Sequence, residues 1–200
     1  MTLPNVEMHV FETILARRSI RNYTAQKVDR TLVRTLLEAA VHAPSAMHQE
    51  PWAFAVIQNR SLLQQLSDHA KPLFVEELRR SHPQRTGHDL QSLTHSEFNI
   101  FYNAGTLIVI CAKPAGSLVV ADCWLAAENL MLAACAMGLG TCVIGMALPA
   151  LTLPELKQTL GIADEFTAIV PIIVGYPNGE TPPTPRKEPL ILAYLSATDG

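Results

Sequence analysis

Residues 119–145 read VVADCWLAAENLMLAACAMGLGTCVIG, and this stretch decides the fold that the sequence predicts. The part from about Val119 to Met137 is apolar on too many sides for a surface helix, so we expect a helix through the centre of the molecule. Gly138 ends that helix, and the β-branched residues that follow favour a buried strand at 141–144. The stretch therefore predicts a helix, a turn and a strand that all belong to the core.

The same region carries the strongest indication of a membrane segment, because no charged residue occurs between Glu128 and Glu155. A spanning helix needs roughly 20 apolar residues, and this run is longer. Glycines at 138, 140 and 145 and prolines at 149 and 154 interrupt it, which favours buried elements over a membrane helix. The N-terminal dozen residues hold no apolar signal segment, so no secretory signal is expected.

Composition predicts one domain, residues 1–200, that covers apolar surface against another subunit. Charged residues make up only 16% of the chain, against about 25% in a typical soluble domain. The net charge of −3 argues against nucleic acid as a partner. The cysteines stand in apolar surroundings without C-x-x-C spacing, which indicates free thiols and a reducing, cytoplasmic compartment; they are Cys111, Cys123, Cys135 and Cys142.

Strands and helices alternate along the chain, which predicts an α/β or α+β fold whose central sheet is covered by helices on both faces. The expected strands are 52–57, 106–112, 141–144 and 166–174. The expected helices are Val6–Ala16, one capped by Asp29 and ended before Pro44, an amphipathic one capped by Ser61, about 119–137, and 154–160.

Two segments fall outside this alternation. Residues 71–96 carry several arginines and histidines around Pro83 and Gly87, which predicts a mobile, solvated excursion. Residues 181–200 form a proline-rich C-terminal arm whose apolar end, Leu190 to Leu195, needs a surface such as a second subunit. A metal site built on His69, His82, His88 and His95 is disfavoured, because these histidines lack tight ligand spacing.

Three short stretches contain candidate functional residues. The run Arg17-Arg18-Ser19-Ile20-Arg21 offers guanidinium groups and a hydroxyl suited to a phosphate, although a solvated basic helix end explains it equally well. The proline-bracketed loop 43–52, APSAMHQEPW, could hold a ligand, or could simply stop a helix and start a strand. The segment 138–145, GLGTCVIG, lets a flat ligand approach the main chain, or is only a helix end.

Together and in this order, these stretches resemble the nitroreductase family of FMN-dependent oxidoreductases, along the whole chain. Further matches are the strand end at 171–177 and a basic residue in the proline-rich tail. The resemblance implies a nitroreductase-like α+β fold with a central mixed sheet, in a homodimer whose subunits exchange terminal arms. It also implies two FMN molecules at the interface, each contacted by both chains.

The resemblance assigns roles to particular residues. Arg17 and Ser19, with Arg18 beside them, match the FMN phosphate contacts, and Arg21 matches a position near the pyrimidine edge of the flavin. Pro44, Ser45 and Ala46 would come from the partner subunit and cover the ring. Ile144 and Gly145 would approach flavin N5, and the tail cations Arg186 and Lys187 would reach the phosphate. His48 and Glu50 depart from the family's Asn and Gln; His48 keeps hydrogen-bonding capacity, whereas a carboxylate puts a contact at Glu50 in doubt.

The resemblance implies hydride transfer from NADPH or NADH, through flavin N5, to an electron-poor acceptor such as a nitroaromatic or a quinone. Arg21 is the catalytic candidate, because a guanidinium stabilises the negative charge that hydride leaves near N1 and C2=O. The excursion 71–96 would set acceptor preference. The alternative is an FMN-binding protein without reductase activity, which senses, stores or cleaves flavin.

Overall fold

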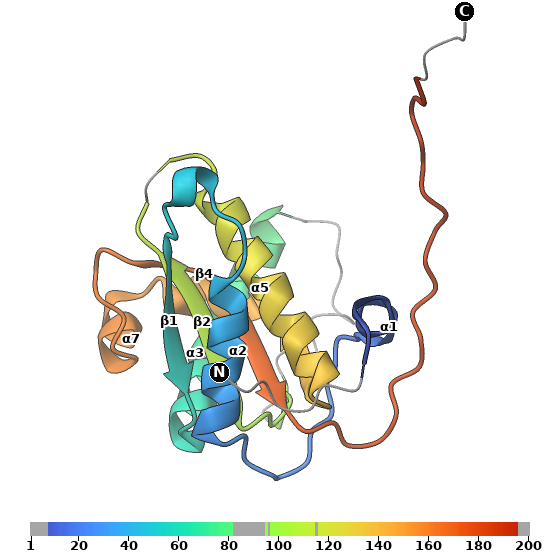
Figure 1. The fold of residues 1–200 in the computed structure, drawn as a ribbon. Coiled ribbons are helices and arrows are strands. Elements are labelled where there is room, and N and C mark those ends of the chain that lie inside the picture. The colour runs from blue at the N-terminus through green and yellow to red at the C-terminus, as the bar shows by residue number, and fades with distance from the viewer. Residues whose placement is uncertain (1–7, 82–94, 96, 115, 196–200) are drawn as a thin grey trace, which may run out of the picture.

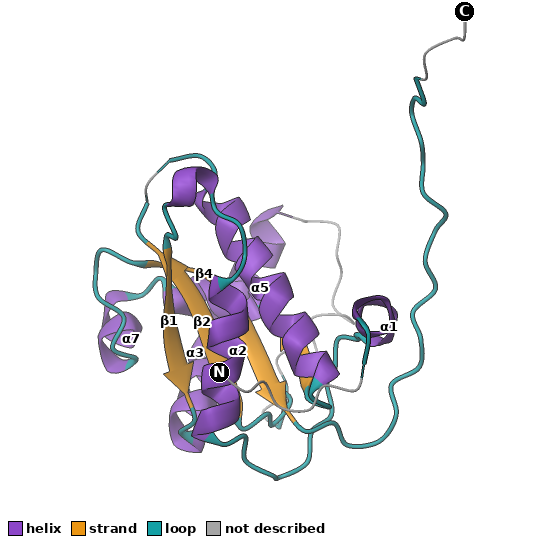
Figure 2. Ribbon diagram, in the orientation of Figure 1, coloured by secondary structure: helices purple, strands orange, loops and turns teal. Residues whose placement is uncertain are grey.

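The computed structural model describes residues 8–81, 95, 97–114 and 116–195. Four strands form one sheet in the order β1-β2-β4-β3, with helices on both faces (Figures 1 and 2). This arrangement confirms the predicted α+β class. The strands are β1 (Trp52–Ile57), β2 (Thr106–Ala112), β3 (Gly140–Val143) and β4 (Thr167–Gly175).

The directions of the strands correct one expectation. The pairs β1–β2, β2–β4 and β3–β4 are all antiparallel. Within the described residues, the parallel pairing is an isolated bridge between Ser19 and Thr141. The expected mixed sheet is therefore wrong for the four strands. Continuous apolar strands are typical of parallel sheets, but helices on both faces bury an antiparallel sheet in the same way.

The side chains of β2 alternate between two apolar clusters. Leu107, Val109 and Cys111 pack with α3 (Arg60–Ser81) and α6 (Leu148–Leu151). Ile108 and Ile110 pack with α2 (Arg30–Val41) and α5 (Val119–Ala136), which lie together across the other face (Figure 1). The period of two in the strand thus fills both layers of the core. The other helices in the described part of the chain are α1 (Val10–Ala16), α7 (Pro154–Thr159) and the short 3₁₀ helices η1 (Ala46–His48) and η2 (Gly145–Ala147).

The start of α2 is as predicted, and the start of α3 is not. Asp29 caps α2, because its carboxylate accepts a hydrogen bond of 2.9 Å from the Leu32 N–H. At α3 the Asn59 Oδ1 accepts bonds from the N–H groups of Ser61 and Leu62. Ser61 therefore lies inside the first turn, and Asn59 is the cap.

The expected excursion at 71–96 is wrong for its first part, residues 71–81. Residues 71–81 continue α3 through Pro72, while most of the remainder, residues 82–94 and 96, lies outside the described part of the chain. Val75 is buried in the core, and the Lys71 ammonium bonds the Phe98 carbonyl at 3.0 Å. These contacts keep the helix packed against the body although proline removes one of its hydrogen bonds.

Apolar side chains are exposed on several elements in the described part of the single chain. Those of α1 are exposed, with Phe11 76% accessible. Part of α5 is exposed as well, including Trp124 and Leu125. The tail from residue 181 to 195 extends away from the body with its leucines in solvent (Figure 1). Helix α5 is long and apolar enough to cross a membrane by composition, and 44% of it is buried in this fold.

The segment after α1 runs close to the sheet where two strands have glycine. A Cβ atom on Gly140 would lie 2.7 Å from Ile20 Cγ1, and one on Gly175 would lie 2.7 Å from Tyr23 Cδ1. Main-chain bonds hold this approach, including one of 2.9 Å from the Ile20 N–H to the Thr141 carbonyl. The Tyr23 hydroxyl donates to the Ile20 carbonyl at 2.7 Å, so the ring has little freedom to move.

We expect Gly175→Ala to destabilise the protein by about 1–3 kcal/mol, because the added methyl group overpacks the buried Tyr23 ring. Gly105→Ala is the matched control, since a Cβ there meets no atom within 4 Å. Thermal unfolding followed by circular dichroism measures both variants. Equal melting temperatures would show that the glycine is not needed for this approach.

Candidate functional site

The predicted phosphate-binding run follows α1 and lies along the outer edge of β3. The bridge between Ser19 and Thr141 fixes its position, and Ile20 packs on Gly140. Ser19 and Arg21, on either side of Ile20, are exposed. The edge of the sheet therefore presents a hydroxyl and a guanidinium to solvent two residues apart on the same segment.

Arg17 and Arg18 differ in what they bond. Arg17 is half-buried and pairs with Glu128 of α5, with 3.5 Å between Nε and Oε1. Arg18 Nη1 donates to the carbonyls of Leu15 and Arg17, as expected of a cation at a helix end. Its Nε is buried and makes no hydrogen bond within the described residues. The run thus retains a donor that suits an anionic oxygen.

Arg21 lies over an aromatic ring. Its Cζ is 5.9 Å from the centre of the Tyr102 ring, within the range of a cation–π contact. The neighbouring Cys142 thiol is buried, which raises its pKa, while Arg21 and Ser19 act in the opposite direction. The thiol therefore stays neutral at neutral pH.

Ile144 and Gly145 follow β3, whereas the sequence predicted Ile144 as the last residue of that strand. The Ile144 N–H bonds the Pro171 carbonyl at 2.8 Å and its side chain is buried, so this N–H is not available to a ligand. Gly145 is exposed, and a Cβ there would meet no atom within 4 Å. Of the two residues, Gly145 has the open surface that a flat ligand needs.

The loop around η1 has an unusual backbone. Met47, His48 and Glu50 all have positive φ values of 52, 54 and 43°, a conformation that non-glycine residues rarely adopt. The Ser45 hydroxyl accepts the Glu50 N–H at 3.1 Å. The buried Asp122 carboxylate accepts the Ala46 N–H at 3.2 Å. The side chains of Met47, His48 and Glu50 consequently point into solvent.

Within one chain, this loop and the arginine run lie at opposite ends of α5 (Figure 1). Ala46 is anchored at Asp122, whereas Thr13 of α1 contacts Cys135. These anchor points are about 20 Å apart along the helix at 1.5 Å per residue, and Glu128, which pairs with Arg17, lies between them at about 9 Å from Asp122. Pro44, Ser45, Ala46 and His48 therefore do not join the arginines of their own chain.

Arg186 and Lys187 are exposed, and the tail that carries them extends away from the body of the chain (Figure 1). Their contact with a phosphate beside Arg17 stays a prediction.

The cysteines are free thiols, as expected, and three of them are buried. Burial raises the pKa of Cys111 and of Cys123 to about 11, so both are protonated at neutral pH. In the described part of the chain, no group of three His, Cys, Asp or Glu residues could hold a metal ion. His82 and His88 lie outside those residues.

Sequence reasoning missed three residues that shape the site. Asp122 anchors the η1 loop, Glu128 pairs with Arg17, and Tyr102 lies beneath Arg21. The two carboxylates had a visible signal, because they are the charged residues of an otherwise apolar helix, where burial requires a partner. Tyr102 had no comparable signal in the sequence.

Known proteins resemble this chain in sequence and in fold. A protein of Archaeoglobus fulgidus with the provisional name NADH dehydrogenase/NAD(P)H nitroreductase is 29% identical over 172 residues, covering 84% of each chain. An iodotyrosine deiodinase of Thermotoga neapolitana is 22% identical over 189 residues, covering 91% of this chain and 96% of that protein. The crystal structure of a nitroreductase with bound FMN from Bacteroides fragilis has a TM-score of 0.75 and 25% identity, covering 96% of this chain and 100% of that one.

The family model for nitroreductases matches residues 14–176, which include the end of α1, the sheet and the glycine segment after α5. The chain belongs to the nitroreductase family.

Proposed function

We propose that this protein is a cytoplasmic FMN-dependent oxidoreductase that takes hydride from NADPH or NADH and gives it to an electron-poor small molecule. A nitroaromatic or a quinone would be such an acceptor. The observation that carries the proposal is the placement of Ser19 and Arg21 along β3, with the open Gly145 directly after the same strand. A nitroreductase of the same fold contains FMN.

The residues present fit FMN. Arg17 and Ser19 offer a guanidinium and a hydroxyl to a phosphate, and the unpaired Nε of Arg18 needs an acceptor. Gly145 leaves its main chain open to a flat ring. When bound, FMN would supply hydride acceptance and donation at N5, so no protein nucleophile or metal is required.

Two residues shape the chemistry in this proposal. Arg21 would hold positive charge beside the pyrimidine edge, where hydride transfer would leave negative charge. The Gly145 main chain would face N5 and keep side chains away from the reacting atom. Both act by position and charge, and neither transfers a proton.

The site is completed by a second copy of the chain in this proposal. Pro44, Ser45, Ala46 and His48 of one subunit would cover the flavin held by the arginines of the other, because one chain keeps them apart. The exposed apolar side chains of α1, α5 and the tail would form the interface. Arg186 and Lys187, carried by an exchanged arm, would then reach a phosphate.

A second candidate is an FMN protein without NAD(P)H reductase activity. The similarity to an iodotyrosine deiodinase favours keeping it, because that name denotes a different reaction on a similar chain. The phosphate and ring contacts would be the same in both cases.

Adding NADPH or NADH to the purified, FMN-loaded protein under argon should bleach the flavin absorbance, because bound flavin accepts the hydride. A nitroaromatic or a quinone added next should restore the absorbance. A chemical reductant is the control that the flavin can be reduced. Bleaching by that reductant alone, with no response to either nicotinamide, would favour the second candidate.

Arg17→Ala and Arg186→Ala should each weaken FMN binding tenfold or more, because each removes a charge-assisted contact of about 1.5–3 kcal/mol. Fluorescence titration measures FMN, and riboflavin, which lacks the phosphate, should bind both variants as it binds the parent. Arg34→Ala is the matched control, since Arg34 also pairs with a glutamate but lies on α2. If both site variants bind FMN as tightly as the parent protein does, the phosphate assignment is wrong and the basic run is a solvated helix end.

Sedimentation should give a particle of about twice 21.9 kDa, because the exposed apolar surface needs a partner. Truncation after Glu180 should shift the protein toward monomer on dilution, because it removes the apolar end of the arm. A full-length monomer that retains FMN would contradict both the dimer and the shared site.

A further inference from the structure

The contact between Arg21 and Tyr102 joins the candidate site to a turn that is distant in sequence. The guanidinium lies over the Tyr102 ring at 5.9 Å from its centre. Cys142 and Tyr23 also lie near Arg21. Cys142 is a neutral thiol, and the Tyr23 hydroxyl already donates to the Ile20 carbonyl. The aromatic face is therefore the group best suited to hold this side chain.

Tyr102 is held in an unfavourable backbone conformation. Its φ is 51°, and that of Asn103 is 59°, both in the left-handed region. Two short bonds close the turn, from the Tyr102 N–H to the Asn99 carbonyl and from the Ala104 N–H to the Phe101 carbonyl, each 2.9 Å. A conformation of this kind persists only where the surroundings enforce it.

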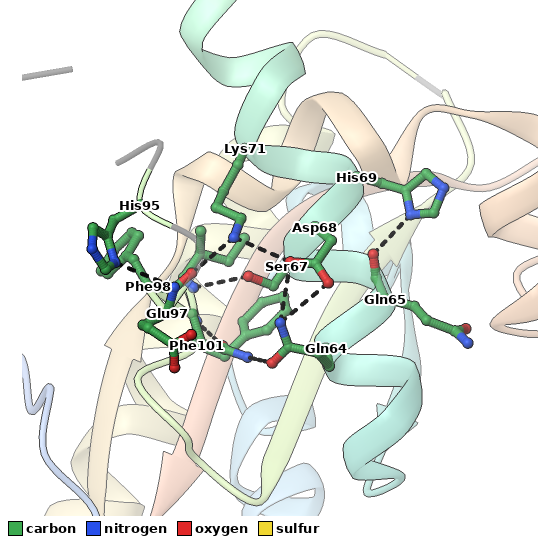
Figure 3. A network of polar contacts seen from close by, with 12 residues as sticks. Gln64, Gln65, Ser67, Asp68, His69, Lys71, His95, Glu97, Phe98 and Phe101 are labelled. Atoms are coloured by element: carbon green, nitrogen blue, oxygen red, sulfur yellow. Dashed lines mark hydrogen bonds and ion pairs between the residues drawn. The ribbon is translucent and has the colours of Figure 1, made fainter. Parts of the chain in front are cut away.

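Helix α3 enforces it through a row of polar side chains directed at residues 98–101 (Figure 3). Lys71 Nζ donates to the Phe98 carbonyl at 3.0 Å and pairs with Asp68 at 3.1 Å. The buried Ser67 hydroxyl accepts the Ile100 N–H at 3.1 Å, and Gln64 accepts from the Asn99 side chain at 2.7 Å. The turn is thus fixed to a long helix.

The aromatic ring itself is also fixed. Phe98 contacts the Tyr102 ring edge to face, with 5.8 Å between the centres and an angle of 80°. Such a pair restricts rotation of the ring. A chain of contacts therefore runs from Lys71 through Phe98 and Tyr102 to Arg21.

We infer that Tyr102 is a positioning residue that holds Arg21 against the pyrimidine edge of the flavin and thereby raises the flavin's reduction potential. The inference rests on the proposed function. A cation fixed beforehand stabilises developing charge without reorganisation, whereas a free arginine side chain must first be ordered. Tyr102 acts through Arg21 and is not itself a catalytic residue.

The test compares Tyr102→Leu with Tyr102→Phe in the full-length, FMN-loaded protein. Both replacements impose similar backbone strain at the positive φ, but only phenylalanine keeps the aromatic face. Spectroelectrochemistry gives the midpoint potential, fluorescence titration gives the affinity for oxidised FMN, and thermal unfolding confirms that the variants fold. Arg21→Ala and the double variant with Tyr102→Leu complete a double-mutant cycle.

Tyr102→Leu should reduce the preference for reduced over oxidised FMN about threefold, the size of an exposed cation–π contact. In a two-electron couple this lowers the potential by about 15 mV. Tyr102→Phe should leave the potential unchanged, and Tyr102→Leu should have no further effect once Arg21 is alanine. This combination would support the inference.

Other outcomes overturn it in distinguishable ways. If the potential falls in Arg21→Ala and does not change in Tyr102→Leu, the positioning role of Tyr102 is rejected. The proposed role of Arg21 is then retained. Equal shifts in both Tyr102 variants would show that the hydroxyl matters instead of the ring. An unchanged potential in Arg21→Ala, or no FMN binding by the parent, would remove the role of Arg21 and the inference with it.

Discussion

The close approach of residues 20–23 to the edge of the sheet is the constraint on which the site depends. Glycine at 140 and 175 leaves room for Ile20 and Tyr23, whose side chains would otherwise meet a Cβ atom at 2.7 Å. Thr141 and Tyr176 carbonyls then accept main-chain bonds from Ile20 and Thr24. Because this segment is fixed, Ser19 and Arg21 project from defined positions on a rigid sheet edge instead of from a loose loop.

The local sequence predicted the bounds of an element well where residues at both of its ends indicate a start and a stop. The strands 52–57 and 106–112 have the predicted bounds, and Asp29 caps α2 as expected. The sequence could not predict whether the strands pair parallel or antiparallel, since an apolar strand buried on both faces has the same composition in either case. The sequence predicted that helix α3 ends before Lys71, whereas it continues past Pro72. The contact between Lys71 and Phe98 helps to stabilise this continuation, and these residues are too far apart in sequence for a local pattern to show it.

The candidate site was predictable to the extent that its residues are contiguous. Arg17 to Arg21 and Ile144 to Gly145 were found as short motifs, and the structure aligns both runs with β3. The residues that hold the arginines come from elsewhere: Glu128 from α5, and Tyr102 from a strained turn. Asp122 of α5 in turn anchors the η1 loop. Arg18 shows a further limit, because one guanidinium bonds the end of α1 through Nη1 while its Nε remains unpaired. A sequence motif cannot show which nitrogen of an arginine bonds a helix end and which one stays unpaired.

The low charge content and the divided site have a common explanation in the proposed dimer. Helix α5 anchors the η1 loop at Asp122 and pairs with Arg17 at Glu128, while Trp124 and Leu125 between them are exposed. A second copy packed over this helix would cover those side chains and bring its own loop toward the arginines. FMN bound between the two chains would contact both, so its binding and dimerisation would be thermodynamically linked. Each would stabilise the other, and the apolar surface of a single chain would be a consequence of placing half of the site on each subunit.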